Sequence, residues 1–157
     1  LGRLVPDELM GASLYDYNVD ISARKMVKWA TQVTEFAYNK ELPYFDLVVP
    51  TVDTTRYSFL VELVLSHGGH VLLVAETGVG KSVIAQMTLN SLAEGDDAKY
   101  VSATVNFSAQ TSSLNLQDAI EAKLDKKRKN LLGPPSGKHM AMFIDDLNMP
   151  ELEEYGA

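Results

Sequence analysis

The chain has 157 residues, of which 46% are apolar, and a formal net charge of −7. This length allows about one domain with a buried core, and no apolar run is long enough to cross a bilayer, so a soluble globular protein without a membrane partner is expected. The acidic balance argues against a general nucleic-acid surface, and the absence of cysteine excludes disulfides and thiolate metal sites and fits a reducing compartment.

The first 42 residues predict a connector and a small hairpin. Residues 1–11 show no clear period and nothing that resembles a signal peptide. β-Formers at two-residue spacing in residues 14–21, a polar break over residues 22–25 and the stretch 26–29 predict a β-hairpin. Its aromatic side chains fit either a ligand platform or the packing of a small sheet, and packing is favoured. Residues 31–42 predict a polar connector.

A helix is predicted before a pair of glycines. Residues 43–53 are apolar and interrupted by prolines, which predicts an extended segment that ends in a turn. Asp53 or Thr54 is the expected N-cap, and apolar residues then recur at helical spacing, namely Tyr57, Leu60, Val61, Val64 and Leu65. Gly68 and Gly69 are expected to end the helix. The histidines nearby show no metal-ligand pattern, so structural roles are expected for them.

A glycine-rich turn follows a short apolar run. Residues 71–74 read Val-Leu-Leu-Val, which predicts a strand buried on both faces. The next eight residues match a phosphate-binding loop in which alanine replaces the usual first glycine: Ala75, Glu76, Thr77, Gly78, Val79, Gly80, Lys81 and Ser82. Gly78 and Gly80 allow a positive φ and a close approach of the backbone to phosphate oxygens.

The residue types of this loop fit nucleotide chemistry. Its exposed N–H groups and the start of the next helix would form an anion cradle. Lys81 supplies a positive charge for the β- and γ-phosphates, and the Ser82 hydroxyl is a hard ligand for Mg²⁺. The alternative is a plain strand–turn–helix connection, which would not require Gly-Lys-Ser at the turn.

A helix, a strand and a longer helix are predicted next. The helix that starts in the loop ends near residues 95–97, and residues 100–107 predict a strand. Residues 112–130 predict a second helix, because apolar side chains recur four residues apart at Leu116, Ile120 and Leu124. The basic run 126–129 would then lie at the C-terminal end of that helix, where the macrodipole favours cations. It is interpreted as a solvated helix end, with an anion or partner site as the alternative.

The last predicted strand ends in two acids. After a predicted loop over residues 131–137, which contains Gly-Pro-Pro, residues 140–144 predict an apolar strand followed by Asp145 and Asp146. Downstream of a phosphate loop, this pattern resembles a Walker B element. In a doubly wound sheet Asp145 would lie beside the loop and hold Mg²⁺ through water. Asp146 takes the position of a carboxylate that activates the attacking water, with an arm one methylene shorter than the usual glutamate.

Several short motifs, taken in order, resemble those of dynein heavy chains. They are Val-Pro-Thr-Val-Asp-Thr at 49–54, Phe-Ser-Ala-Gln-Thr at 107–111, Gly-Pro-Pro at 133–135, Phe-Ile-Asp-Asp-Leu-Asn-Met-Pro at 143–150 and Tyr-Gly-Ala at 155–157. These details resemble the third of the six AAA+ modules in the motor ring, and the axonemal branch more than the cytoplasmic one. Ala75 and Glu76 depart from the family pattern, which more often has glycine and then a small residue or proline.

The resemblance implies an α/β fold. The expected architecture is the large subdomain of an AAA+ P-loop NTPase, with an incomplete parallel sheet and flanking helices, preceded by a small β-hairpin. Residues 1–42 would be the connector and hairpin, and residues 43–157 the N-terminal part of the ATP-binding domain. The family's sheet order, 5-1-4-3-2, implies that residues 71–74 do not pair directly with residues 140–144. The chain would then be an excerpt that does not fold alone.

The resemblance also implies ATP or ADP with Mg²⁺ as cofactors, and it assigns site residues. Ser82 and Asp145 would hold the metal ion. Asp146 and Asn106 would be catalytic, with Asn106 as a polar switch residue that faces the Walker B acid. The remaining nucleotide contacts would be Val83, all residues from Ala75 to Ser82, and, beside the adenine, Val49, Pro50 and Thr51.

The implied function is a part of a microtubule motor that drives ciliary or flagellar movement, in the cytoplasm, cytoskeleton and axoneme. Partners would be neighbouring AAA+ modules and, through other parts of the full chain, intermediate and light chains and microtubules. One interpretation is a module that hydrolyses ATP slowly, favoured by Lys81, Ser82 and Asp145. The other is a regulatory nucleotide-binding module without appreciable turnover, favoured by Asp146 and Glu76. An unrelated P-loop enzyme, such as a small-molecule kinase, would need an acceptor site that the sequence does not show.

Overall fold

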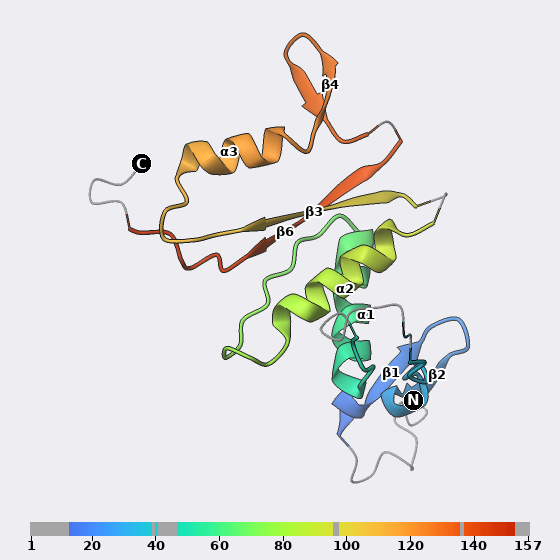
Figure 1. Cartoon of the computed structure of the whole chain (residues 1–157). Helices are drawn as coiled ribbons and strands as arrows, with labels where there is room; N and C mark the ends of the chain where they lie inside the picture. The colour runs from blue at the N-terminus through green and yellow to red at the C-terminus, as the bar shows by residue number, and fades with distance from the viewer. Residues whose placement is uncertain (1–12, 39, 41–46, 96–97, 136, 153–157) are drawn as a thin grey trace, which may run out of the picture. The chain divides into compact units, whose positions relative to one another are not determined.

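The structure is a computed structural model of the 157-residue chain, and it describes residues 13–38, 40, 47–95, 98–135 and 137–152. The chain divides into two compact units, Leu1–Leu60 and Val61–Ala157, each of which is described by itself (Figure 1). The predicted domain limits, 1–42 and 43–157, stay predictions. In the described part of the chain, no helix is both long and apolar enough to cross a membrane.

The first unit contains the predicted hairpin. A short 3-10 helix, η2 (Leu14–Asp16), leads into strand β1 (Tyr17–Asp20), which pairs antiparallel with β2 (Lys25–Lys28). In the turn, Asp20 Oδ1 accepts a hydrogen bond from the Ala23 N–H at 2.8 Å, and Arg24 adopts a φ of 52°. A second 3-10 helix, η3 (Trp29–Thr31), follows β2 directly. The period-two pattern therefore predicted this hairpin correctly.

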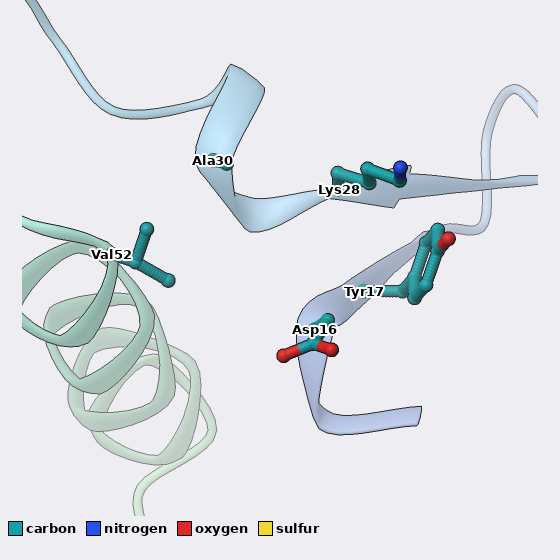
Figure 2. Close-up of a pocket in the computed structure, with 5 residues that line it drawn as sticks. All are labelled: Asp16, Tyr17, Lys28, Ala30 and Val52. Atoms are coloured by element: carbon teal, nitrogen blue, oxygen red, sulfur yellow. The ribbon is translucent and has the colours of Figure 1, made fainter. Parts of the chain in front are cut away.

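The hairpin's aromatic side chains have two different surroundings: one packs against another ring, and one lines a shallow pocket. Trp29 is buried and meets Phe59 edge to face, with ring centroids 5.4 Å apart, a geometry worth about 0.5–1.5 kcal/mol beyond the buried area. Tyr17 and Lys28 instead line a pocket of about 280 Å³, below the ~300–1,000 Å³ usual for ligand sites. Figure 2 shows this pocket with its other lining residues, Asp16, Ala30 and Val52. Packing is therefore the better description of Trp29.

Helix α1 (Val52–Ser66) begins earlier than expected. Thr51 Oγ1 accepts a hydrogen bond from the Thr54 N–H at 3.1 Å, and Thr54 Oγ1 accepts one from the Thr51 N–H at 2.8 Å. This reciprocal pattern is that of a capping box, with threonine in place of the usual glutamate or glutamine. The prediction of Asp53 or Thr54 as the N-cap was wrong, because Thr51 caps the helix and Thr54 satisfies the Thr51 N–H in return.

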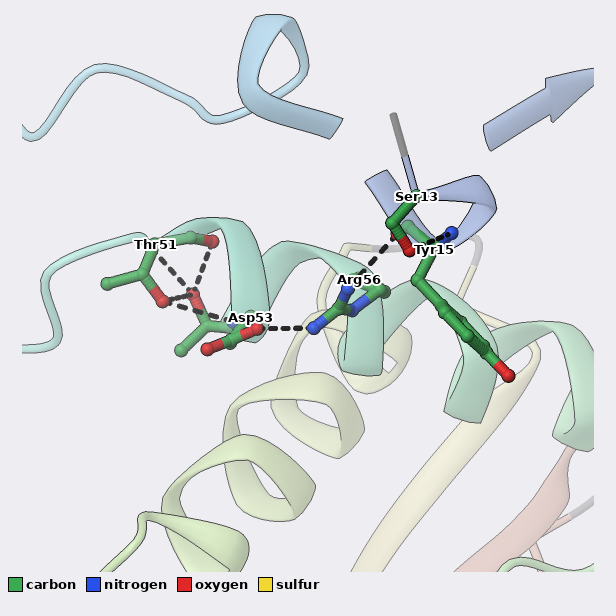
Figure 3. A network of polar contacts seen from close by, with 6 residues as sticks. Ser13, Tyr15, Thr51, Asp53 and Arg56 are labelled. Carbon is green, nitrogen blue, oxygen red and sulfur yellow. Dashed lines mark hydrogen bonds and ion pairs between the residues drawn. The ribbon is translucent and has the colours of Figure 1, made fainter. Parts of the chain in front are cut away.

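Arg56 connects the first turn of α1 with η2. Its Nη1 donates to the Tyr15 carbonyl oxygen at 3.1 Å, and its Nη2 pairs with Asp53 Oδ1 (Figure 3). Ser13 Oγ, also drawn there, accepts from the Tyr15 N–H at 3.3 Å and caps η2. Because Asp53 is largely exposed, the ion pair contributes only about 0–1 kcal/mol, and its effect is to fix local geometry.

The end of α1 confirms the predicted glycine stop. The Gly68 N–H donates to the Leu65 carbonyl oxygen and the Gly69 N–H to the Val64 carbonyl oxygen, both at 2.9 Å. With a φ of 75° at Gly68, this is a Schellman motif. A Cβ at Gly69 would lie 2.7 Å from Val64 Cγ1. Gly68 is therefore required for its backbone angle and Gly69 for space.

The second unit is built on a parallel strand pair. Strands β3 (Tyr100–Asn106) and β6 (His139–Asp145) form a two-stranded parallel sheet, as expected for the second and third predicted strands. Helix α2 (Lys81–Ala93) packs against both, and Figure 1 shows α3 (Ser113–Glu121) on the other side of the pair. The buried side chains of this unit are mostly small: Val61, Ala85, Thr88, Leu89, Ala103, Val105 and Ala141.

Residues 71–74 do not form the predicted buried strand. Residues 69–76 have no regular secondary structure, and the exposed fractions of Val71, Leu72 and Val74 are 39%, 72% and 82%. A strand requires a neighbour for its backbone groups, and within the described residues β6 pairs with β3 alone. The prediction of a buried strand was wrong, whereas the expected lack of direct pairing with residues 140–144 is confirmed.

The predicted helix over residues 112–130 ends early. Helix α3 begins correctly after Ser112, whose Oγ accepts from the Asn115 N–H at 3.2 Å, but it ends at Glu121. Strand β4 (Asp125–Arg128) then pairs antiparallel with β5 (Leu131–Gly133). The basic run 126–129 therefore lies in a hairpin instead of a helix end, and the predicted loop over residues 131–137 begins with a strand. The helix was predicted too long because cross-strand pairs override the high helix propensity of lysine and arginine, and residues 131–133 form a strand because they pair with β4.

Candidate nucleotide site

The predicted phosphate loop is a turn that leads into α2. Gly78 and Gly80 have φ values of 84° and 87°, in the left-handed region that favours glycine. A Cβ at either position would meet no other atom within 4 Å, so the backbone angle, and not crowding, requires glycine here. Gly80 is the N-cap residue of α2, and no side chain caps this helix end. The first N–H groups of α2 are therefore suited to an anion.

Lys81 closes the loop on itself. Its Nζ donates to the Ala75 carbonyl oxygen at 2.9 Å and to the Glu76 carbonyl oxygen at 2.6 Å. The two residues that depart from the family pattern thus contact Lys81 through their backbones, whatever side chains they carry. Sequence reasoning missed these contacts, because any residue type supplies a carbonyl oxygen. Thr77 and Val79 are exposed in the same turn.

Ser82 and Asp145 come together from distant parts of the chain. Ser82, in the first turn of α2, donates its hydroxyl to Asp145 Oδ1 at the end of β6, at 3.0 Å and across 63 residues of sequence. Asp145 is half-buried, and its Oδ1 also accepts from the Asp146 N–H at 3.1 Å. The structure therefore places the two predicted metal ligands in direct contact.

The donor set of this pair fits Mg²⁺. Both groups supply hard oxygen atoms of the kind that Mg²⁺ prefers, and Ser82 Oγ lies 3.0 Å from Asp145 Oδ1. Among the described residues, no group of three or more histidines or acids could hold a metal ion. A metal ion here would complete its shell with phosphate oxygens and water, as Mg²⁺ commonly does.

The two predicted catalytic residues lie beside Asp145. Asn106 is its partner in the β3–β6 register, and the next N–H, of Phe107, donates to the Asp145 carbonyl oxygen at 3.0 Å. Asp146 is exposed and has a φ of 53°, a left-handed conformation that costs a residue other than glycine about 1 kcal/mol. Its carbonyl oxygen accepts from the Met149 N–H at 2.9 Å, which closes a turn. The Phe107 contact was also missed, since it depends on strand register.

The remaining predicted contacts fall outside this cluster. Val83 is exposed in the first turn of α2. Val49, Pro50 and Thr51 belong to the first unit, so their position beside an adenine stays a prediction. An apolar hollow of about 440 Å³ at the end of α1 contains none of the predicted site residues; Leu63, Val64, His67 and Gly69 line it.

The histidines with described contacts have structural partners. His67 Nδ1 is hydrogen-bonded with the Leu63 carbonyl oxygen at 2.8 Å. The His139 ring lies 5.8 Å from the Tyr100 ring, centroid to centroid. These contacts agree with the structural roles expected for the histidines.

A Gly-Lys-Ser turn at the start of a helix, joined to an acid at the end of a parallel strand, is the arrangement of the P-loop class of α/β proteins. The family model described as "P-loop containing dynein motor region" matches residues 36–157. The chain belongs to this family, which confirms the predicted relationship with dynein heavy chains.

Proteins similar to this chain include axonemal and flagellar dynein heavy chains. Dynein axonemal heavy chain 6 of Homo sapiens is 46% identical over 144 residues, which are 92% of this chain and 3% of that protein. Dynein axonemal heavy chain 12 of Rattus norvegicus is 43% identical over 147 residues, 92% of this chain and 5% of that protein. Dynein-1-beta heavy chain, flagellar inner arm I1 complex, of Chlamydomonas reinhardtii is 41% identical over 145 residues, which are 92% of this chain and 3% of that protein. The chain thus spans only 3–5% of the length of these relatives.

Proposed function

We propose that this chain forms the start of the third AAA+ module in the motor ring of an axonemal dynein heavy chain, and that it binds Mg-ATP. The observation that carries the proposal is the hydrogen bond of 3.0 Å between Ser82 Oγ and Asp145 Oδ1, which joins the two nucleotide motifs. Membership of an ATPase family supports it. The order of the motifs at 49–54, 107–111 and 143–150 supports the third position in the ring.

Binding follows from the loop's own groups. The N–H groups of the loop and of the first turn of α2 donate to phosphate oxygens. Lys81 exchanges the carbonyl oxygens of Ala75 and Glu76 for the β- and γ-phosphates, which carry full charge. Ser82 and Asp145 would hold the metal ion. Bound Mg²⁺ would neutralise charge on the phosphate oxygens.

Hydrolysis at this site would depend on Asp146. In the slow-hydrolysis version of the proposal, the Asp146 carboxylate orients the attacking water. Asn106, the register partner of Asp145, is the polar switch residue that responds to the state of the bound phosphate. The Asp146 arm is one methylene shorter than glutamate, and a misplacement of about 1 Å costs roughly 100-fold in rate. We therefore propose turnover that is slow and limited by water activation.

A regulatory module without appreciable turnover is the second candidate. It is favoured by the exposure of Asp146, whose carboxylate makes no hydrogen bond with a described residue, and by the negative charge of Glu76 in the loop. In both versions, the nucleotide state of this module would act on neighbouring AAA+ modules of the same heavy chain. Microtubules and the intermediate and light chains would contact other parts of the heavy chain, in the axoneme of a cilium or flagellum.

The test uses the motor region of the full heavy chain with the nucleotide sites of the other modules disabled. Ser82→Ala and Asp145→Asn should each weaken the Mg²⁺-dependent affinity for ATP by at least about tenfold, or 1.4 kcal/mol. Ser91→Ala, at an exposed position of the same helix, is the matched control and should have no effect. Unchanged affinity in both site variants would contradict the proposal. Single-turnover hydrolysis in the unmodified site then separates slow hydrolysis from a purely regulatory role.

A further inference from the structure

We propose that the β4–β5 hairpin, residues 125–133, is a docking surface for an acidic protein segment. The basic run within it was expected to be a solvated helix end, and the nucleotide site does not use it. Figure 1 shows the hairpin projecting from the C-terminal end of α3, and its two strands form a sheet of their own. The proposal concerns charge and apolar surface on this hairpin and does not rest on nucleotide binding.

The first observation is unbalanced charge. The hairpin contains four cations and one carboxylate in a chain whose formal net charge is −7, and all four residues of β4 are exposed. Lys127 is held within the hairpin, since its Nζ lies 3.6 Å from Asp125 Oδ2 and its stem lies over Gly133. The other three cations make no ion pair with any described residue: Lys126, Arg128 and Lys129. Such a cluster attracts carboxylates.

The second observation is exposed apolar surface next to these cations. Leu131 and Leu132 are 52% and 40% exposed, and they pair across the ladder with Arg128 and Lys126. A lysine-rich strand alone is a common device that keeps a sheet edge soluble. Exposed leucines have the opposite effect, because their apolar side chains lower the solubility of the same sheet edge. Consecutive strand residues point to opposite faces, so each face of the hairpin carries one leucine next to a cation, and such a pair can bind an apolar residue and a neighbouring carboxylate.

The size of the patch favours a short acidic protein segment. Four residues of strand span about 13 Å, enough for a few carboxylates. A nucleic acid or an anionic bilayer would extend beyond the hairpin over the rest of an acidic chain, which would repel it. The irregularity in register between Lys126 and Arg128 bends β4, so an added strand is also disfavoured. The partner would be recognised through its side chains: carboxylates would pair with the cations, and an apolar residue would contact the leucine on the face that the partner covers.

The test is zero-length cross-linking of the purified full heavy chain with a carbodiimide, which joins a lysine amine to a carboxylate in contact with it. Mass spectrometry should find Lys126 or Lys129 joined to an acidic peptide that also contains apolar residues, from the heavy chain itself or from an associated subunit. Lys25, exposed on β2 of the other hairpin, is the matched control and should give at least about fivefold less product. The double variant Lys126→Glu/Arg128→Glu should lower cross-linking at Lys129 by at least about fivefold, whereas Lys25→Glu should not.

Two results would overturn the proposal. One is cross-linking at Lys126 and Lys129 no higher than at Lys25. The other is hairpin-dependent binding of the heavy chain to a DNA duplex or to phosphatidylserine vesicles, which would assign the patch to a different partner. Hydrogen exchange over residues 125–133 shows whether the charge-reversed hairpin stays folded. If it does not, the pair Lys126→Gln/Arg128→Gln replaces it, and unchanged Lys129 cross-linking in that variant refutes the proposal equally.

Discussion

The contacts of Lys81 allow its contribution to nucleotide affinity to be estimated. In the structure, its Nζ makes two hydrogen bonds to carbonyl oxygens, at 2.9 and 2.6 Å. In the complex it would exchange these neutral acceptors for anionic phosphate oxygens, which add ion-pair attraction to the ammonium, and hydrogen bonds to charged groups have a typical net value of about 1.5–3 kcal/mol. The affinity for ATP depends on the free-energy difference between these two sets of hydrogen bonds. Lys81→Ala should therefore weaken ATP binding by at least about tenfold, or 1.4 kcal/mol.

The assay is titration of the motor region with a fluorescent ATP analogue, with the other modules' sites disabled. Lys123→Ala, at an exposed position just beyond α3, controls for the loss of one positive charge. A second readout needs no nucleotide: hydrogen exchange in the loop should rise in Lys81→Ala, because the carbonyl oxygens of Ala75 and Glu76 lose their donor. Unchanged affinity would refute the phosphate-loop assignment. Unchanged exchange would refute the claim that Lys81 closes the loop.

Three further outcomes are expected. Asp146→Glu should raise the single-turnover rate of ATP hydrolysis and Asp146→Asn should lower it; if ATP still binds and neither rate changes, Asp146 is not the base. Thr51→Ala should remove the α1 cap at a cost of about 1 kcal/mol, seen as roughly fivefold faster hydrogen exchange in the first turn of α1, and exchange at the wild-type rate would argue against the capping box. Gly69→Ala should loosen the last turn of α1 by about 1–3 kcal/mol, because its Cβ would lie 2.7 Å from Val64 Cγ1; undiminished protection there would show that the chain relaxes freely.

The features that the sequence predicted well are those set by local rules. The Schellman end of α1 follows from two glycines, and the β1–β2 hairpin from period-two spacing around a polar break. The glycine-rich turn into α2 was predicted from Gly-Lys-Ser and the glycines before it, and its contact with nucleotide stays a prediction. The proximity of Ser82 and Asp145 was predicted because the carboxyl end of a strand in a doubly wound sheet lies beside the phosphate loop.

The features that the sequence missed depend on partners far along the chain. Lys126 and Arg128 are good helix formers, so the local pattern extended α3, yet their cross-strand leucines place them in β4. Residues 71–74 have strand composition, but no described strand pairs with them. The Thr51 cap was missed for a simpler reason. Asp53 and Thr54 are equally good cap residues by type, and only the reciprocal bonds between Thr51 and Thr54 distinguish the three.

The left-handed backbone of Asp146 has a consequence for how this position responds to selection. Glycine there would remove about 1 kcal/mol of backbone cost and would remove the carboxylate in the same step. Glutamate would lengthen the arm, but it tolerates a φ of 53° less well than aspartate or asparagine does. A library screened for thermal tolerance should therefore converge on glycine or asparagine at this position and give modules that bind nucleotide without turning it over. A library screened for turnover should retain an acid here and accept a less stable sheet edge.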